Sequence, residues 1–181
     1  MSLDYAPERE KVAGDVVCGT IFAEFGNRTN SVRGAIERRL TLGGGTMAAH
    51  RHELLLPPDA PDLLLDRENL VSHYERSLLP NQRELLVIFT MRFERDGSLH
   101  AQWELARSFV RQHIVGRRLG TVLVQHCPGL AGYADGKPHV HALAIARELI
   151  GSNFAAFTPL SRPGAKAILA AEWQAWQAAH C

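Results

Sequence analysis

Short apolar runs alternate with amphipathic stretches along this chain, and the pattern predicts strands and helices interspersed through the sequence. Five runs have the β-branched and aromatic content that is typical of strands, and they cover residues 15–25, 50–56, 85–93, 120–126 and 139–147. Pro57 and Pro58 must end the second run, because proline cannot donate a hydrogen bond to a neighbouring strand.

Four stretches show the helical spacing of apolar residues, at 31–40, 66–79, 103–115 and 165–180. Residues 27–31 offer cap residues before the first helix, three glycines at 43–45 stop it, and Pro80 ends the second. Residues 1–15 are expected to form a polar arm. A loop is expected around Phe154, Phe157 and Pro159.

These elements predict an α+β fold in which an antiparallel sheet of about five strands is flanked by helices. The chain has 181 residues, 46% of them apolar, which is enough for one well-buried core and too little for two comfortable ones. The sequence contains no internal repeat, low-complexity tract or interdomain linker. We therefore expect a single domain over residues 1–181.

The composition argues against several classes of protein. No run approaches the roughly 18 apolar residues of a membrane span, and the N-terminal segment is charged, so neither a span nor an export signal is expected. Cys18, Cys127 and Cys181 form no C-x-x-C pair, which fits a reducing compartment better than a disulfide framework. A cytoplasmic location is therefore expected.

The net charge of +1 neither marks nor excludes a nucleic-acid partner, because phosphate binding needs a local basic patch. Arginines crowd two segments, one near residues 28–39 and one in the predicted helix before residue 120. Each cluster is either a solvated helix face or a track along a DNA backbone. The candidate DNA-binding residues are Arg28, Arg33, Arg38, Arg39, Arg107 and Arg111.

Three histidines have the spacing of a metal site. His126 closes one predicted strand, and His139 and His141 lie in the next, where side chains two apart point to the same face. The twelve residues between the strands include three glycines and two prolines, enough to return the chain and bring the three imidazoles together. Imidazole is the commonest ligand of transition metals, although an H-x-H pair is also compatible with two half-buried histidines bonded to backbone or carboxylate groups.

The order of a strand ending in histidine, a Gly/Pro-rich loop, P-H-x-H and an apolar strand resembles the metal motif of the HUH endonucleases. The likeness is greatest to the MobA/MobL-type plasmid mobilisation relaxases. It continues in HELLLPPDAPDLLLDRENL (52–70), RELLVIFTMRF (83–93), WELARSFVRQHIVGRRLG (103–120) and the FAAFTPLSRP and EWQAW segments that follow the histidines. It covers about residues 54–176, and residues 1–50 match poorly.

This resemblance implies a relaxase-like fold and a chemistry. In the family, three histidines hold a divalent ion that polarises a scissile DNA phosphate, so His126, His139 and His141 are the expected ligands here. The expected ion is Mg²⁺ or Mn²⁺ in function, with Zn²⁺ or Ni²⁺ acquired during purification. The implied partner is single-stranded DNA from a plasmid or mobile-element origin, together with accessory mobilisation proteins.

The resemblance also suggests supporting residues. Glu84 falls where the family often carries an acidic residue near the site. Aromatic side chains that stack on unpaired bases are expected near such a site, and Phe154, Phe157 and Tyr133 are the candidates, with core or loop packing as the alternative.

The sequence departs from the family at the nucleophile. Relaxases of this type carry a tyrosine on an N-terminal helix in an A-A-Y-R-like context, whereas the corresponding SVRGAIERRL has none, and Arg38 or a nearby phenylalanine takes its place. Of the three tyrosines, Tyr5 lies in the N-terminal arm, which could fold over the site, and Tyr133 lies between the metal ligands. Tyr74 lies on a helix that the family uses for structure.

Three functions therefore remain open. The first is a metal-dependent nickase of single-stranded DNA that uses a displaced tyrosine or an activated water. The second is a degenerate relaxase that binds metal and DNA without covalent strand transfer. The third is an unrelated three-histidine metalloenzyme, such as a small hydrolase or oxygenase.

Overall fold

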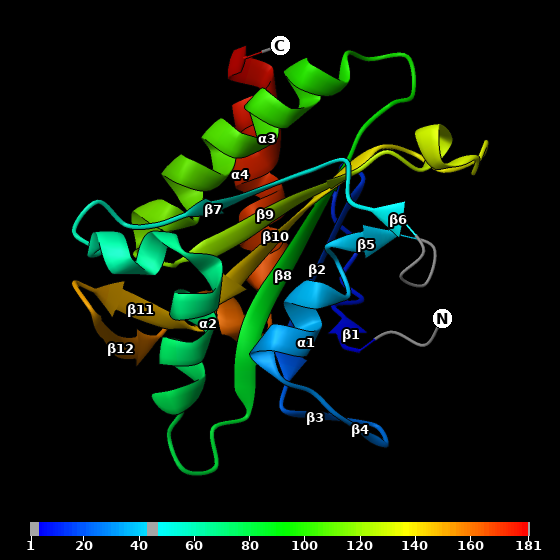
Figure 1. Cartoon of the computed structure of the whole chain (residues 1–181). Helices are drawn as coiled ribbons and strands as arrows, with labels where there is room; N and C mark the ends of the chain where they lie inside the picture. The colour runs from blue at the N-terminus through cyan, green and yellow to red at the C-terminus, as the bar shows by residue number, and fades with distance from the viewer. Residues whose placement is uncertain (1–3, 43–46, 181) are drawn as a thin grey trace.

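The computed structural model describes residues 4–42 and 47–180, and its centre is a six-stranded sheet in which every neighbouring pair is antiparallel. The strand order across the sheet is β1 (Ala6–Pro7), β2 (Val16–Phe22), β8 (Glu84–Arg92), β10 (His139–Ile145), β9 (Thr121–His126) and β7 (Arg51–Leu55). The strand that carries two histidines therefore lies inside the sheet, between β8 and β9 (Figure 1).

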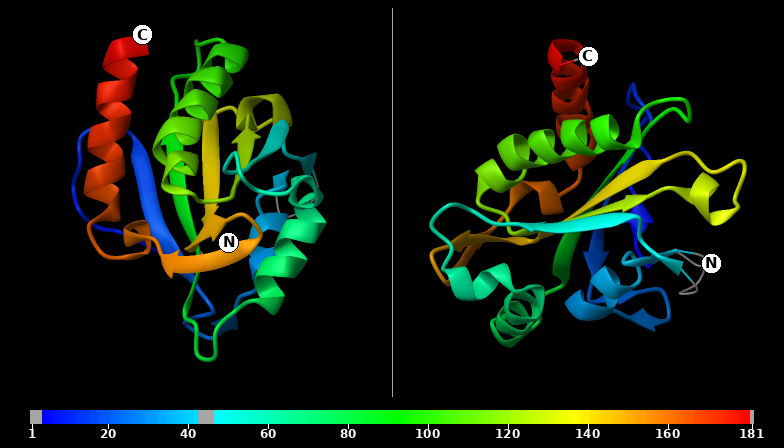
Figure 2. Two further views of the ribbon diagram at one scale, coloured as in Figure 1. Left: turned by 90° about the vertical axis from the view of Figure 1, so that its left-hand side faces the viewer. Right: turned by 45° about the horizontal axis from the view of Figure 1, so that its top comes forward.

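Four α-helices cover the two faces of this sheet (Figures 1 and 2). One face packs against α1 (Val32–Glu37) and α2 (Arg67–Arg76), and the other packs against α3 (Leu99–His113) and α4 (Ala165–His180). Three short hairpins lie outside the sheet: β3 (Glu24–Phe25) with β4 (Arg28–Thr29), β5 (Thr41–Leu42) with β6 (Met47–Ala48), and β11 (Arg147–Ile150) with β12 (Asn153–Phe157).

Short polar side chains start three of the helices. Ser31, Asp66 and Ser98 each accept a hydrogen bond from the backbone N–H three residues ahead, which satisfies one of the free donors of the first turn. The cap at Ser98 starts α3 at Leu99, four residues before the predicted start at residue 103. Periodicity alone did not detect this first turn, because Leu99 is its only large apolar residue.

The alternation of apolar residues along the strands builds two cores. On the α3 and α4 face, Phe89 and Met91 of β8 pack with Trp103, Phe109 and Trp173 of the helices. On the α1 and α2 face, the intervening residues of the same strands pack with Ile36 and Leu70 among others. Both faces of the sheet are therefore buried along most of its length, as its nearly continuous apolar strands indicate.

The predicted α+β class and the antiparallel sheet are confirmed, with β1 as a sixth, two-residue strand. The predicted polar arm is wrong in part, because Asp4 and Tyr5 are buried and Ala6–Pro7 pairs with β2. The predicted loop around Phe154 is also wrong. Residues 147–157 form the β11–β12 hairpin, and Arg147 binds the carbonyls of Phe154 and Ala155 inside it.

Two further predictions concern the end of the first helix and membrane-spanning segments. The glycine stop at 43–45 lies outside the described residues. Within residues 4–42 and 47–180, no helix is both long enough and apolar enough to cross a bilayer.

Candidate metal centre

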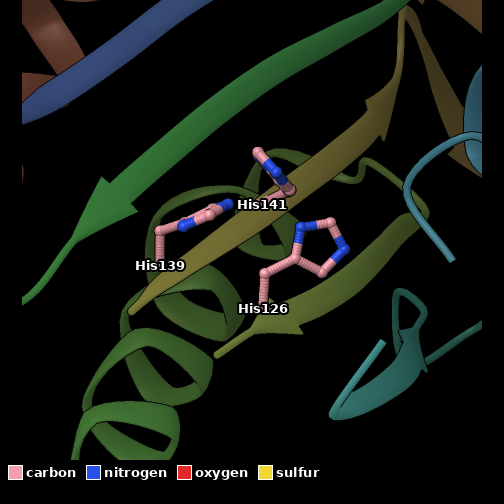
Figure 3. A group of neighbouring side chains, drawn as sticks. All are labelled: His126, His139 and His141. Carbon is pink, nitrogen blue, oxygen red and sulfur yellow. The ribbon is translucent and has the colours of Figure 1, made fainter. Parts of the chain in front are cut away.

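The sheet register brings the three predicted histidines together. His139, the first residue of β10, lies directly opposite His126, the last residue of β9. His141 lies two residues further along β10 and projects from the same face. Figure 3 shows the three rings turned toward one another from these two neighbouring strands.

The three imidazoles form a compact, three-sided cluster. Their ring centroids are 4.8–5.2 Å apart, and each pair of rings is close to perpendicular, at 75–85°. One nitrogen of each ring lies within 4.8 Å of the corresponding nitrogens of the other two. Rings that are nearly perpendicular in this way can direct three lone pairs at one point, whereas stacked rings cannot.

Hydrogen bonds on the outer side of each ring leave one nitrogen free. His126 Nε2 lies 2.6 Å from the carbonyl of Arg39, and His139 Nδ1 lies 2.9 Å from the carbonyl of Lys137. Since a carbonyl can only accept, these nitrogens carry the protons, and the lone pairs are on His126 Nδ1 and His139 Nε2. His141 Nδ1 lies 2.8 Å from the hydroxyl of Thr90, which leaves its Nε2 for the cluster.

The surroundings keep the imidazoles neutral. Burial lowers the pKa of His126 to about 4, and it also lowers the pKa of His139. Burial lowers the pKa of His141 well below its usual value, and the positive charge that the other two histidines would carry has the same effect. Neutral imidazole is the form that donates a lone pair to a metal ion.

The residues present therefore fit a divalent ion. A metal-binding histidine usually donates its second N–H to a carbonyl, carboxylate or hydroxyl, which fixes the ring and makes it more basic. All three rings have such a partner. His126, His139 and His141 would hold the ion, and a three-ligand set leaves further positions for oxygen atoms of a substrate.

A buried ion-pair cluster supports the first ligand. The Asp4 carboxylate, 3% exposed, binds both terminal nitrogens of Arg39 at 2.5 Å, and it also binds Arg38 at 2.6 Å and 3.0 Å. Arg39 is the residue whose carbonyl accepts from His126. The sequence pointed to Arg38 and Arg39 as DNA-binding residues, and the structure pairs both with Asp4, with Arg39 buried and Arg38 exposed.

Two residues of the site had no part in the sequence prediction. Thr90 and Arg92 of β8 lie opposite His141 and His139, so their side chains share the histidine face. The Arg92 side chain is 43% exposed and pairs with Asp15 at 3.0 Å. Two polar residues spaced two apart in the apolar strand ELLVIFTMR are the signal that could have found them.

The tyrosines differ sharply in position. Tyr74 is fully buried, and its hydroxyl donates to the carbonyl of Leu85, while Tyr133 is 50% exposed in the loop between His126 and His139. Tyr5 is buried against Gly19 of β2, on the histidine face, with the Arg39 guanidinium 5.8 Å from its ring centroid.

Two arginines influence both Tyr5 and a histidine. Burial raises the pKa of Tyr5, and the nearby charges of Arg39 and Arg92 oppose this rise. The charges of the same two arginines contribute to lowering the pKa of His141.

Other expected site residues lie elsewhere. Glu84 starts β8, six residues or about 20 Å from Thr90 along the strand, and it pairs with Arg162. Phe154 packs between His73 and Tyr74, and Phe157 lies over Arg147 in the β11–β12 hairpin. The structure does not bring these three residues to the histidines.

The remaining arginines are dispersed. Arg28 lies in the β3–β4 hairpin, and Arg33 binds Glu68 of α2. Arg107 of α3 binds Glu53 with two hydrogen bonds of 2.6 Å and 2.8 Å, and Arg111 approaches the same carboxylate. α3 packs on the face of the sheet opposite the histidines. Arg107 and Arg111 therefore lie on the other side of the sheet from the candidate site.

Comparison with known proteins finds a solved structure of similar fold. No protein-family model and no curated protein matches the sequence. The fold matches a structure described as the molecular basis of vancomycin resistance transfer in Staphylococcus aureus, with a TM-score of 0.70, over 92% of this chain and 91% of that chain. The identity is 16%, so the match establishes the fold alone, and this fold has the α+β class and antiparallel sheet that the sequence predicted.

Proposed function

We propose that the chain binds a divalent metal ion through His126, His139 and His141, and that it binds and nicks single-stranded DNA at a plasmid or mobile-element transfer origin. The observation that carries this proposal is the convergence of three neutral imidazoles, each fixed by an outer hydrogen bond, on one face of this fold. The fold similarity favours this function over an unrelated hydrolase or oxygenase.

A bound divalent ion supplies Lewis-acid chemistry, since it polarises phosphate oxygens and offsets the negative charge that develops in the transition state. The protein keeps the three imidazoles neutral by burial and orients one nitrogen of each toward the site of the ion. Arg92, beside His139, contributes a charge-assisted hydrogen bond to the same phosphate. Mg²⁺ and Mn²⁺ suit a site that must also accept phosphate oxygens.

The nucleophile is Tyr5 or water. Attack by the Tyr5 hydroxyl on phosphorus would break the bond to the 3′ oxygen and leave the DNA 5′ phosphate on the tyrosine. The raised pKa of Tyr5 keeps it protonated at neutral pH, so its proton would have to leave as the bond forms. Attack by water would cut the strand without a covalent adduct. We expect nicking with little adduct, because the N-terminal helix carries no tyrosine.

The test uses single-stranded circular DNA and supercoiled plasmid, incubated with Mn²⁺ and followed on denaturing gels. Nicking is expected for the wild type and not for His139→Ala. A covalent adduct that disappears in Tyr5→Phe and persists in Tyr133→Phe would identify Tyr5 as the nucleophile. Absence of nicking from every DNA carrying a candidate origin would reject the enzymatic proposal.

A second candidate function rests on Arg38. One of the possible alignments with the family places this residue at the position of the tyrosine, where Phe22 or Phe25 is the alternative. The Arg38 guanidinium is held by Asp4 and by Asn30 at 3.1 Å. Guanidinium remains protonated and cannot attack phosphorus. The alternative is a protein that binds metal and single-stranded DNA without cutting it, and Mn²⁺-dependent binding in the absence of nicking would support it.

A further inference from the structure

A pocket of about 120 Å³ opens beside the metal centre. Its lining includes the His126 ring, and its walls come from two segments far apart in the sequence: residues 47–50 and residues 127–131 after β9. A water molecule takes up about 30 Å³ in the liquid, so there is room for roughly four waters.

The pocket has an exposed apolar rim. Leu130 is 68% exposed on one side and Met47 is 42% exposed on the other, while Ala49 and Ala131 are further lining residues. Tyr133, 50% exposed, follows Leu130 in the same loop. Large apolar side chains gathered in solvent beside a candidate reactive centre are typical of a surface that binds a ligand.

The pocket contains two imidazoles, those of His126 and His50. His126 is buried, and its two nitrogens are already assigned, one to the carbonyl of Arg39 and one to the cluster. His50 is exposed, and its backbone N–H donates a hydrogen bond of 3.0 Å to the carbonyl of Gln125. The cavity thus combines apolar walls with one exposed imidazole, that of His50, which can bond to a polar edge. A nucleobase has this combination, with two apolar faces and a polar rim.

We propose that this pocket binds the nucleobase next to the phosphate at the three-histidine centre. The inference rests on the proposed function, because it takes single-stranded DNA as the ligand, and it adds a base subsite to a phosphate site. His126 is shared by the two sites, so a phosphate held at the histidines delivers its adjoining base to the pocket. Contact with Leu130 and Met47 recognises the face of a base and tolerates different sequences.

The test compares two probes with the same backbone: a labelled oligodeoxythymidylate, and an oligomer of equal length whose sugars lack bases. Fluorescence anisotropy with Mn²⁺ should show that the wild type binds the first more tightly. Leu130→Ser should weaken binding of the oligodeoxythymidylate by roughly five- to tenfold and leave the abasic oligomer unchanged. Ala131→Phe, which fills the pocket, should act in the same way.

Leu63→Ser is the matched control, because Leu63 is 70% exposed and lies before α2, away from the pocket. This variant should bind both probes like the wild type. Equal loss for both probes in Leu130→Ser, or no loss in either pocket variant, would overturn the base subsite while wild-type binding upheld the proposed function. Failure of the wild type to bind any DNA, with Mn²⁺ still bound, would reject both.

Discussion

At the scale of single residues, the candidate site is defined by what lies behind each imidazole. The carbonyls of Arg39 and Lys137 and the hydroxyl of Thr90 engage one nitrogen of each ring, and the other nitrogen is left for the cluster. Each ring is therefore fixed in a position that could hold a metal ion, because a metal-binding histidine usually uses its second nitrogen for such a hydrogen bond.

The first prediction concerns metal content. Replacing His126, His139 or His141 with Ala should lower bound Mn²⁺ or Zn²⁺ steeply, because a two-ligand site is weak. His100→Ala, an exposed histidine of α3, is the control and should leave the metal content unchanged. Atomic absorption on the purified proteins measures it, and unchanged stoichiometry in all three ligand variants would contradict the assignment.

A second prediction concerns Asp4. Burial raises the pKa of this carboxyl, but the hydrogen bonds and charges of Arg39 and Arg38 outweigh it and lower the pKa from 3.8 to about 2. Because the folded pKa is below the unfolded one, the stabilisation is complete above pH 4 and is lost as the pH falls toward 2. The shift corresponds to about 2 kcal/mol.

Asp4→Asn should therefore destabilise the fold by about 3 kcal/mol at neutral pH, since it leaves two arginines without their buried partner. It should also weaken metal binding, because Arg39 positions the carbonyl that holds His126. Glu68→Gln removes an exposed ion pair with Arg33 and should cost less than about 1 kcal/mol. Denaturant titration distinguishes the two variants, and equal effects would show that the Asp4 cluster has no special role.

At the scale of elements, the two histidine strands were predictable and their supports were not. Strict alternation in H-V-H placed both imidazoles on one face, and the glycines and prolines before His139 predicted the return of the chain. Two of the three ring partners, Thr90 of β8 and Arg39 shortly after α1, lie 51 and 87 residues away from their histidines in sequence. The third, Lys137, is only two residues from His139. The two distant contacts depend on strand order and register, which local patterns do not encode.

The same reason explains the error at the N-terminus. DYAPEREK is mostly polar, so the sequence predicts an arm. In the structure Asp4 is buried by pairing with the two arginines that follow α1, and Tyr5 is buried by packing on Gly19. A charged residue becomes buried when its partner is buried with it, and the sequence does not show that partner. The β11–β12 hairpin was missed because its strands have only four and five residues and their register is irregular between Arg147 and Leu149.

A third prediction follows from the contact of β1 with β2. A Cβ atom on Gly19 would lie 2.5 Å from the Tyr5 ring and 2.8 Å from the carbonyl of Ala6, so Gly19→Ala must push β1 away from the sheet. The expected loss of stability is about 2 kcal/mol. Gly129→Ala, where no atom lies within 4 Å of the added carbon, should be close to neutral. Thermal unfolding followed by circular dichroism measures the difference, and equal stability of the two variants would contradict the observed packing of Tyr5.

At the scale of the whole molecule, charge is balanced rather than concentrated. The net charge is +1, and most of the arginines that the sequence marked for DNA are already paired with carboxylates: Arg33 with Glu68, Arg38 and Arg39 with Asp4, and Arg107 with Glu53. Arg92 is also paired, with Asp15 at 3.0 Å, but it lies beside His139. On the proposed function, attraction for a nucleic acid would therefore come from the histidine face, where an ion would add positive charge to that of Arg92.

This balance gives the last prediction, which concerns salt. Each phosphate contact with single-stranded DNA contributes about −0.7 to the slope of log affinity against log salt, so a site with about three contacts should have a slope near −2. Arg92→Gln should reduce that slope by roughly one contact, because Arg92 lies beside His139 on the binding face. Arg107→Gln, on the opposite face of the sheet, should leave it unchanged. Anisotropy titrations with oligodeoxythymidylate over a range of salt concentrations measure both variants at constant Mn²⁺. A larger effect of Arg107→Gln than of Arg92→Gln would place the DNA on the α3 and α4 face of the sheet and would reject the histidine face as its binding surface.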